Sequence, residues 1–137
     1  MNLLGIALAG AAGALARYGL SGLVHRFLGA GFPWGTLAVN LVGCFLLGLL
    51  LEVSRQSGWV SPGFRTIAGI GFLGAFTTFS TFGVETYRSL ESGDWLMASL
   101  NVLANVAGGL LLVAAGSSLA RFLTQFARFL VQTGGGL

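Results

Sequence analysis

The sequence contains very little charge and no lysine at all. Only 8% of its 137 residues are charged, as seven arginines and four carboxylates, whereas 55% are hydrophobic and the mean hydropathy is +0.86. So few charged side chains cannot cover the surface of a soluble domain this apolar. The composition therefore excludes an ordinary water-soluble fold and predicts a protein surrounded by membrane lipid.

Other scarce residues exclude further classes of function. The arginines are dispersed along the chain, which argues against a nucleic-acid partner. Cys44 is the single cysteine, so no intrachain disulfide can form, and a packing role is the simplest interpretation. His25 is the single histidine and lies beside Arg26 at the end of an apolar run, where a solvated or headgroup contact is favoured over catalysis. With no catalytic constellation, we predict that the chain is not an enzyme.

Four apolar runs are long enough to cross a bilayer, which takes about 20 residues. They cover about residues 3–27, 32–51, 66–84 and 95–120. These runs predict an all-α membrane protein with a single four-helix transmembrane domain over residues 1–137. The glycine-rich end predicts a frayed C-terminal tail over 124–137. Because no Lys or Arg precedes the first run, we interpret it as a span and not as a signal peptide.

The arginines bear on orientation, because an even number of spans places both termini on one side. The side of the termini has Arg55, Arg65, Arg121 and Arg128, and the opposite side has Arg26 and Arg88. So small a bias permits insertion in both orientations, and hence an antiparallel homodimer with dual topology. Four helices leave little interior for a solute path, so a transport function also predicts at least a dimer, in which glycines allow close helix packing.

Polar residues within the apolar runs are the candidates for function, because each is costly in lipid without a partner. Arg17 is either a fixed charge that draws anions into a vestibule or a side chain that reaches the membrane interface. The Asn40 amide either donates to an anion or binds a neighbouring helix. Asn101 and Asn105 are four apart and share a helix face, as a polar track or as a hydrogen-bonded pair.

The third run carries the strongest pattern. Four hydroxyls and two glycines lie close together at mid-membrane depth, and several of these residues are poor helix formers: Gly71, Gly74, Thr77, Thr78, Ser80 and Thr81. The pattern predicts a broken third helix, whose free carbonyl and N–H groups need ions or polar partners. Phe79 and Phe82 would lie on one side of a resumed helix, where positive ring edges can favour a small anion. Simple packing or lipid contact is the alternative.

Three segments, in order along the chain, are similar to the signature stretches of the Fluc (CrcB) family of fluoride channels. They are GAAGALARY at 10–18, GTLAVNLVG at 35–43 and TTFSTF at 77–82. The resemblance covers the chain from its N-terminus to about Ala120. It implies an antiparallel dual-topology homodimer in the cell inner membrane, with two pores that passively export cytoplasmic fluoride and so lower its toxicity.

The resemblance also implies roles for individual residues. The pore residues would be Asn40, Phe79, Ser80, Thr81, Phe82 and, from the fourth span, Asn105. Arg17 would lie at a vestibule and Glu85 near a pore end, and backbone carbonyls of Gly74 and Thr77 would hold a structural sodium ion at the dimer centre. The family has Tyr and Ser in the polar track of its fourth span, where this chain has Asn101 and Asn105 followed by Gly109. Which groups of that span contact the ion therefore remains open.

A small multidrug exporter is the main alternative, because it is also a four-helix antiparallel dimer. Proton coupling requires a titrating carboxylate within the membrane, and the first, second and fourth runs contain none before their ends. Only Glu85 could serve, and it more simply marks the end of the third run. A structural or assembly subunit is a further alternative, but it leaves the hydroxyl-rich segment unexplained.

Overall fold

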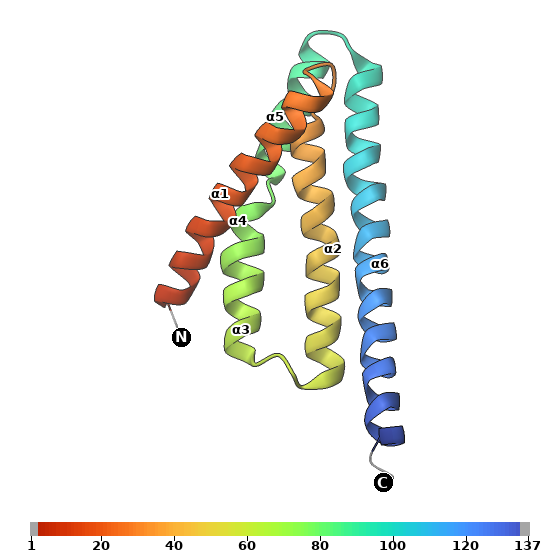
Figure 1. Cartoon of the computed structure of the whole chain (residues 1–137). Coiled ribbons are helices and arrows are strands. Elements are labelled where there is room, and N and C mark those ends of the chain that lie inside the picture. Colours follow the sequence, from red (N-terminus) through yellow and green to blue (C-terminus); the bar gives the residue numbers. More distant parts are fainter. Residues whose placement is uncertain (1–2, 135–137) are drawn as a thin grey trace.

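The computed structural model describes residues 3–134, and within that range it consists of helices without strands. Four helical spans are long and apolar enough to cross a membrane, which confirms the predicted all-α class (Figure 1). Three are single helices: α1 (Leu3–Leu28), α2 (Trp34–Ser57) and α6 (Trp95–Gly134). The third span comprises α3 (Pro62–Thr66), the π-helical η1 (Ile67–Leu73), α4 (Gly74–Phe76) and α5 (Phe79–Glu91).

The helices extend further than the apolar runs that predict them. α2 continues past residue 51 to Ser57, and the third span begins at Pro62, where the Ser61 hydroxyl accepts a hydrogen bond from the Phe64 N–H at 3.2 Å. α6 continues past residue 120 to Gly134, so the segment predicted as a tail is helical over 124–134, and residues 135–137 lie outside the described range. Hydropathy locates the part of a helix that suits lipid, whereas backbone hydrogen bonding continues through polar residues.

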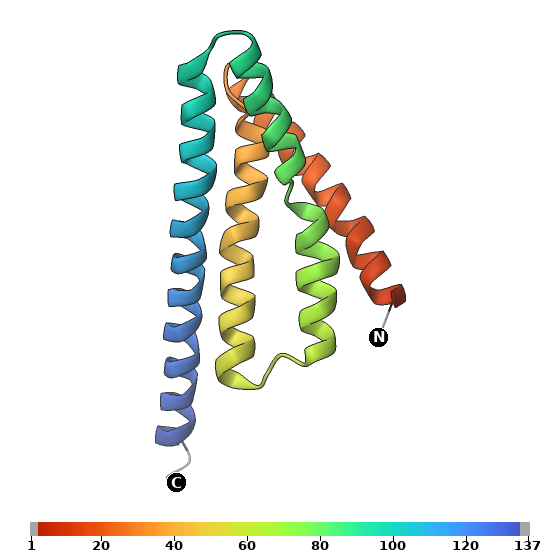
Figure 2. The same cartoon turned by 180° about the vertical axis from the view of Figure 1, so that it is seen from behind.

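Both termini lie at the same end of the molecule, as an even number of spans requires (Figures 1 and 2). α2 and α6 pack along much of their length, and two glycines make this close approach possible. A Cβ atom at Gly48 would lie 2.4 Å from the Val113 carbonyl oxygen, and one at Gly116 would lie 2.1 Å from the Phe45 carbonyl oxygen. The two backbones are therefore in direct contact, a mode of packing typical of membrane helices.

The interior of a single subunit is small. Val39, Leu73 and Phe76 form its buried apolar cluster, at the junction of α2 with η1 and α4. Many other large apolar side chains are exposed, among them Leu15 on α1 and Leu110 on α6. Such a surface suits lipid or another subunit and does not suit water.

The third span bends near its middle, at Thr77 and Thr78 (Figure 2). Both residues have extended backbone angles, with φ −82° and ψ 158° at Thr77 and φ −148° and ψ 103° at Thr78. The Thr78 hydroxyl then caps α5 by accepting a hydrogen bond from the Thr81 N–H at 3.2 Å. The hydroxyl-rich segment therefore lies where helical hydrogen bonding is interrupted.

Candidate functional site

Asn40 of α2 lies against the bend and bonds both backbone groups of Thr78. Its Oδ1 accepts a hydrogen bond from the Thr78 N–H at 2.8 Å, and its Nδ2 donates to the Thr78 carbonyl at 3.3 Å. In a continuous helix these backbone groups would bond within the helix, and at this depth an unpaired one is costly. One carboxamide thus replaces hydrogen bonds that the bend removes.

A chain of side-chain hydrogen bonds continues from Asn40 across to α6 and back to α5. Asn40 donates to Asn105 Oδ1 at 2.9 Å, and Asn105 donates to the backbone and side-chain oxygens of Asn101, both at 3.0 Å. Asn101 is 1% exposed and donates to the Thr86 hydroxyl at 2.9 Å, which donates to the Phe82 carbonyl at 2.8 Å. Asn101 and Asn105 are therefore a hydrogen-bonded pair within a longer polar track that joins α2, α5 and α6.

A hollow of about 320 Å³ brings together four of the six predicted pore residues: Asn40, Phe79, Phe82 and Asn105. Gly74 and Thr77, the predicted sodium ligands, line the same hollow. The rings of Phe79 and Phe82 lie 5.5 Å apart with 55° between their planes, so the two residues lie on one side of α5 as predicted. Phe82 is buried, whereas Phe79 is 83% exposed in a single subunit.

The other two predicted pore residues, Ser80 and Thr81, line a separate and larger cleft of about 860 Å³. Arg17 also lines this cleft, together with Thr36 and Glu85. Successive helical residues turn by about 100°, so Ser80 and Thr81 face away from the side that carries Phe79 and Phe82. The predicted pore residues are thus divided between two hollows, with the bend and Asn40 at their junction.

Glu85 lines both this cleft and a further hollow of about 400 Å³. Its Oε1 accepts a hydrogen bond from the Thr36 hydroxyl at 2.7 Å, while its Oε2 is buried without a hydrogen-bond partner in the protein. The sequence places Glu85 near a pore end but does not single out Thr36. Its position in the sequence could have identified Thr36, because it precedes Asn40 by one helical turn and so shares its face of α2. Thr86 likewise follows Phe82 by one helical turn, but its hydrogen bond to Asn101 depends on the contact with α6.

No group of three or more His, Cys, Asp or Glu residues that could hold a metal occurs within residues 3–134. The backbone at the bend is a different kind of candidate. In a continuous helix the carbonyls of Gly74 and Thr77 would accept from the N–H groups of Thr78 and Thr81. Those N–H groups instead donate to Asn40 Oδ1 and to Thr78 Oγ1. Carbonyl oxygens released in this way suit a hard cation such as sodium.

Four apolar spans around a hydrogen-bonded polar track are typical of multi-pass membrane proteins that carry a solute path. Residues 4–117 match the family described as "CrcB-like protein, Camphor Resistance (CrcB)". The chain belongs to this family, which confirms the resemblance seen in the three sequence segments.

Several relatives bear the name "Fluoride-specific ion channel FluC". The protein from Geobacter sp. (strain M21) is 52% identical over 118 residues, which cover 86% of this chain and 95% of the relative. The Geobacter sulfurreducens protein is 51% identical over 122 residues, or 89% of this chain and 98% of the relative. The Geotalea uraniireducens protein is 55% identical over 101 residues, or 74% and 82%.

Proposed function

We propose that this protein is a fluoride-specific ion channel that passively exports cytoplasmic fluoride and so lowers its toxicity. The main support is its identity of about one half, over most of its length, to relatives named as such channels. The hollow that Asn40 and Asn105 of the polar track line together with Phe79 and Phe82 also supports the proposal. The activity is that of a channel and not of an enzyme.

The chemistry of fluoride fits this arrangement. Fluoride crosses membranes as neutral hydrofluoric acid and becomes trapped on ionising in the cytoplasm, so a passive anion pathway lets the membrane potential expel it. The ion is small and strongly hydrated, and closely placed donors must replace its water. In our proposal Asn40 supplies a donor beside Phe79 and Phe82, whose ring edges add attraction without a competing formal charge. Ser80 and Thr81 supply further donors along the cleft on the other side of the bend.

We further propose that two antiparallel copies form the working unit, with two pores per dimer. Ser80 and Thr81 lie near the middle of the third span, yet both are exposed in a single subunit. Polar groups at this depth are costly against lipid, so a second copy or a wet pore must cover them. The weak arginine bias between the two ends is compatible with both orientations in a cell inner membrane.

Two smaller sites belong to the same proposal. Arg17, within the cleft that Ser80 and Thr81 line, would attract anions to a vestibule. The carbonyls of Gly74 and Thr77 would hold a structural sodium ion where two copies meet. If they do, replacing sodium by N-methyl-D-glucamine lowers the melting temperature of the purified protein. An unchanged melting temperature would reject the sodium site without affecting the channel.

Fluoride efflux from liposomes tests the channel, recorded with a fluoride-selective electrode and with chloride efflux in parallel. We expect rapid fluoride release without chloride release and without an imposed proton gradient. Phe79→Ile and Phe82→Ile should each slow it strongly, because they remove the aromatic ring edges. Phe27→Ile is a matched control, since Phe27 lies at the end of α1 and is 77% exposed. If well-folded protein released no fluoride, or only in response to a proton gradient, the proposal would fail.

A further inference from the structure

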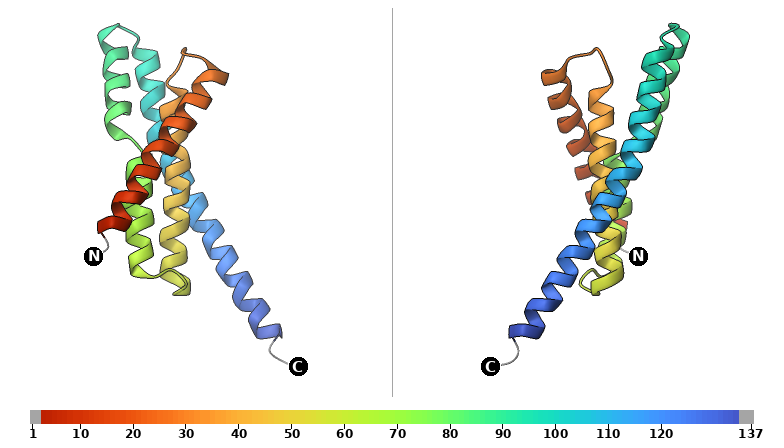
Figure 3. Two further views of the ribbon diagram at one scale, coloured as in Figure 1. Left: turned by 60° about the vertical axis from the view of Figure 1, so that its left-hand side comes forward. Right: turned by 90° about the vertical axis from the view of Figure 1, so that its right-hand side faces the viewer.

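α6 is much longer than a bilayer requires. Its 40 residues, at about 1.5 Å each, span roughly twice the hydrocarbon core of about 30 Å. About the first 20 residues from Trp95 suffice to cross that core. Its C-terminal segment, Arg121–Gln132, which we call the α6 extension, lies beyond the family match at 4–117, and α6 continues past the ends of the other helices (Figure 3).

The α6 extension is amphipathic. Four polar residues recur on one face at helical spacing: Arg121, Gln125, Arg128 and Gln132. On another face, Phe122, Leu123 and Phe126 are 64%, 45% and 50% exposed, and the two phenylalanine rings stack with centroids 6.2 Å apart. A cationic polar face beside an aromatic apolar face is typical of helices that lie at a membrane interface.

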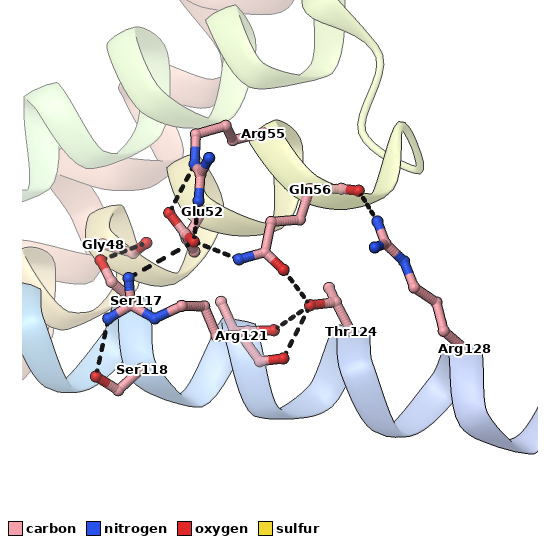
Figure 4. Close-up of polar contacts among 10 residues, drawn as sticks. Gly48, Glu52, Arg55, Gln56, Ser117, Ser118, Arg121, Thr124 and Arg128 are labelled. Carbon is pink, nitrogen blue, oxygen red and sulfur yellow. Dashed lines mark hydrogen bonds and ion pairs between the residues drawn. The ribbon is translucent and has the colours of Figure 1, made fainter.

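The polar face packs against the C-terminal end of α2 (Figure 4). The buried Thr124 hydroxyl donates to Gln56 Oε1 at 2.8 Å, and Arg128 donates to the Gln56 carbonyl. The Gln56 amide in turn donates to Glu52. These contacts hold the extension in a fixed position relative to the transmembrane helices, so that its apolar face is directed away from the protein.

The charges at this contact do not balance. Glu52 accepts two hydrogen bonds from Arg55, at 2.7 and 3.1 Å, and lies 3.7 Å from Arg121. Arg128 lies about two helical turns further along α6 and donates to the Gln56 carbonyl. One carboxylate therefore contacts two guanidinium groups, and Arg128 adds a third positive charge on the same face of α6. The Glu52 side chain is only 11% exposed, whereas those of Arg55 and Arg121 are 68% and 48% exposed. The excess positive charge is accessible, and the negative charge is not.

We propose that Arg55, Arg121 and Arg128, which we call the arginine cluster, bind the headgroup of an anionic phospholipid while Phe122, Leu123 and Phe126 lie among its acyl chains. Guanidinium groups bind phosphate with directional, charge-assisted hydrogen bonds. An anionic leaflet attracts basic segments beside a span, and the exposed apolar face supplies the second contact that stable membrane attachment needs. The proposal depends on membrane embedding and not on which ion the protein conducts.

Native mass spectrometry of the full-length protein tests this site, with phosphatidylglycerol, phosphatidylcholine and inorganic phosphate added in separate titrations. We expect phosphatidylglycerol to bind on the order of tenfold more tightly than phosphatidylcholine. Arg55→Gln combined with Arg121→Gln should remove most of this preference. Arg26→Gln combined with Arg88→Gln, at the other end of the molecule, is the matched control and should keep it.

Glu52→Gln should increase phosphatidylglycerol binding, and misfolding would not produce such an increase. It removes the one carboxylate from the arginine cluster, so phosphatidylglycerol should bind more tightly than to the unchanged protein. The proposal is overturned if the unchanged protein binds the two lipids equally, or if the two double arginine variants lose the same amount of phosphatidylglycerol binding. It is also overturned if Glu52→Gln binds phosphatidylglycerol no more tightly than the unchanged protein. Binding of inorganic phosphate that competes fully with phosphatidylglycerol would also overturn it in favour of a free-phosphate site. A lower oligomeric state on Phe122→Ser with unchanged lipid preference would assign the apolar face to a second copy.

Discussion

Both the sequence and the structure single out Asn40, but only the structure identifies its partners within the protein. A carboxamide at mid-membrane depth must have a partner, and the sequence alone leaves an anion and a neighbouring helix as alternatives. The structure supplies two helix partners, Thr78 and Asn105. The anion role stays a prediction. Pairwise contacts of this kind cannot be predicted from spacing, because they depend on how α2 is rotated against α5 and α6.

Replacing Asn40 by Leu should impair both stability and conduction. The Thr78 N–H, the Thr78 carbonyl and the Asn105 amide oxygen lose their partner, at about 1–3 kcal/mol for each buried group left unpaired. Fluoride efflux should fall at least about tenfold, because a donor to a charged ligand is lost. Efflux from liposomes and the melting temperature in detergent measure the two effects.

Gln125→Leu is the control for that change, because it removes an amide from the exposed face of the α6 extension, far along α6 from Asn105. It should alter neither measurement. If Asn40→Leu behaved like this control, the polar track would have no role in either stability or conduction.

At the scale of elements, the apolar runs predicted which segments cross the membrane, and the hydroxyl-rich segment predicted where the third span departs from a regular helix. Helix ends were predicted poorly, because Glu52 and Arg55 look like a loop by hydropathy although they continue α2. Close helix packing at glycines within the spans was expected. Which glycines make these contacts could not be predicted, since the contact of Gly116 with Phe45 depends on the crossing of α2 and α6.

Gly116→Ala should therefore weaken the contact between α2 and α6. The added Cβ would meet the Phe45 carbonyl at 2.1 Å, and backbone cannot move aside cheaply. Such overpacking typically costs about 1–3 kcal/mol. Gly22→Ala on α1 meets nothing within 4 Å and should be neutral or stabilise by up to about 1 kcal/mol. Unfolding midpoints in mixed micelles compare the two, and equal midpoints would contradict backbone contact at this crossing.

At the scale of the whole molecule, composition was enough to predict a membrane protein, because so few charges cannot cover a water-exposed surface, and the four apolar runs predicted four spans. Assembly could not be derived in the same way. Phe79, Ser80 and Thr81 are exposed in a single subunit, which is compatible with a second copy, but the dimer stays a prediction. The sequence carries only the weak arginine bias as evidence for how copies are oriented.

Dual topology makes a quantitative prediction. In a Cys44→Ala background, Ser92→Cys in the turn between α5 and α6 should be labelled by a membrane-impermeant maleimide in about half of the molecules in intact cells. The other half should react only after the membrane is opened. Ser61→Cys, at the opposite end of the third span, should give the same division. Complete labelling of one site and none of the other would show a single orientation and exclude an antiparallel pair.

The polar track has a direction, and this constrains how an ion could use it. The Thr78 N–H donates to Asn40, and each member then donates to the next, through Asn105, Asn101 and Thr86, until the Phe82 carbonyl accepts. Backbone groups at the start of α5 fix both ends, so no amide of the track can reverse without losing hydrogen bonds. Both hydrogens of the Asn40 amide are already donated, to the Thr78 carbonyl at 3.3 Å and to Asn105 at 2.9 Å.

An anion that binds Asn40 must therefore displace a resident acceptor, and the longer bond, to Thr78, is the one that yields at lower cost. If Asn40 binds the conducted ion, as we propose, each passing ion would briefly loosen the bend, and the same hydrogen bond would set the conduction rate and the rigidity of the third span.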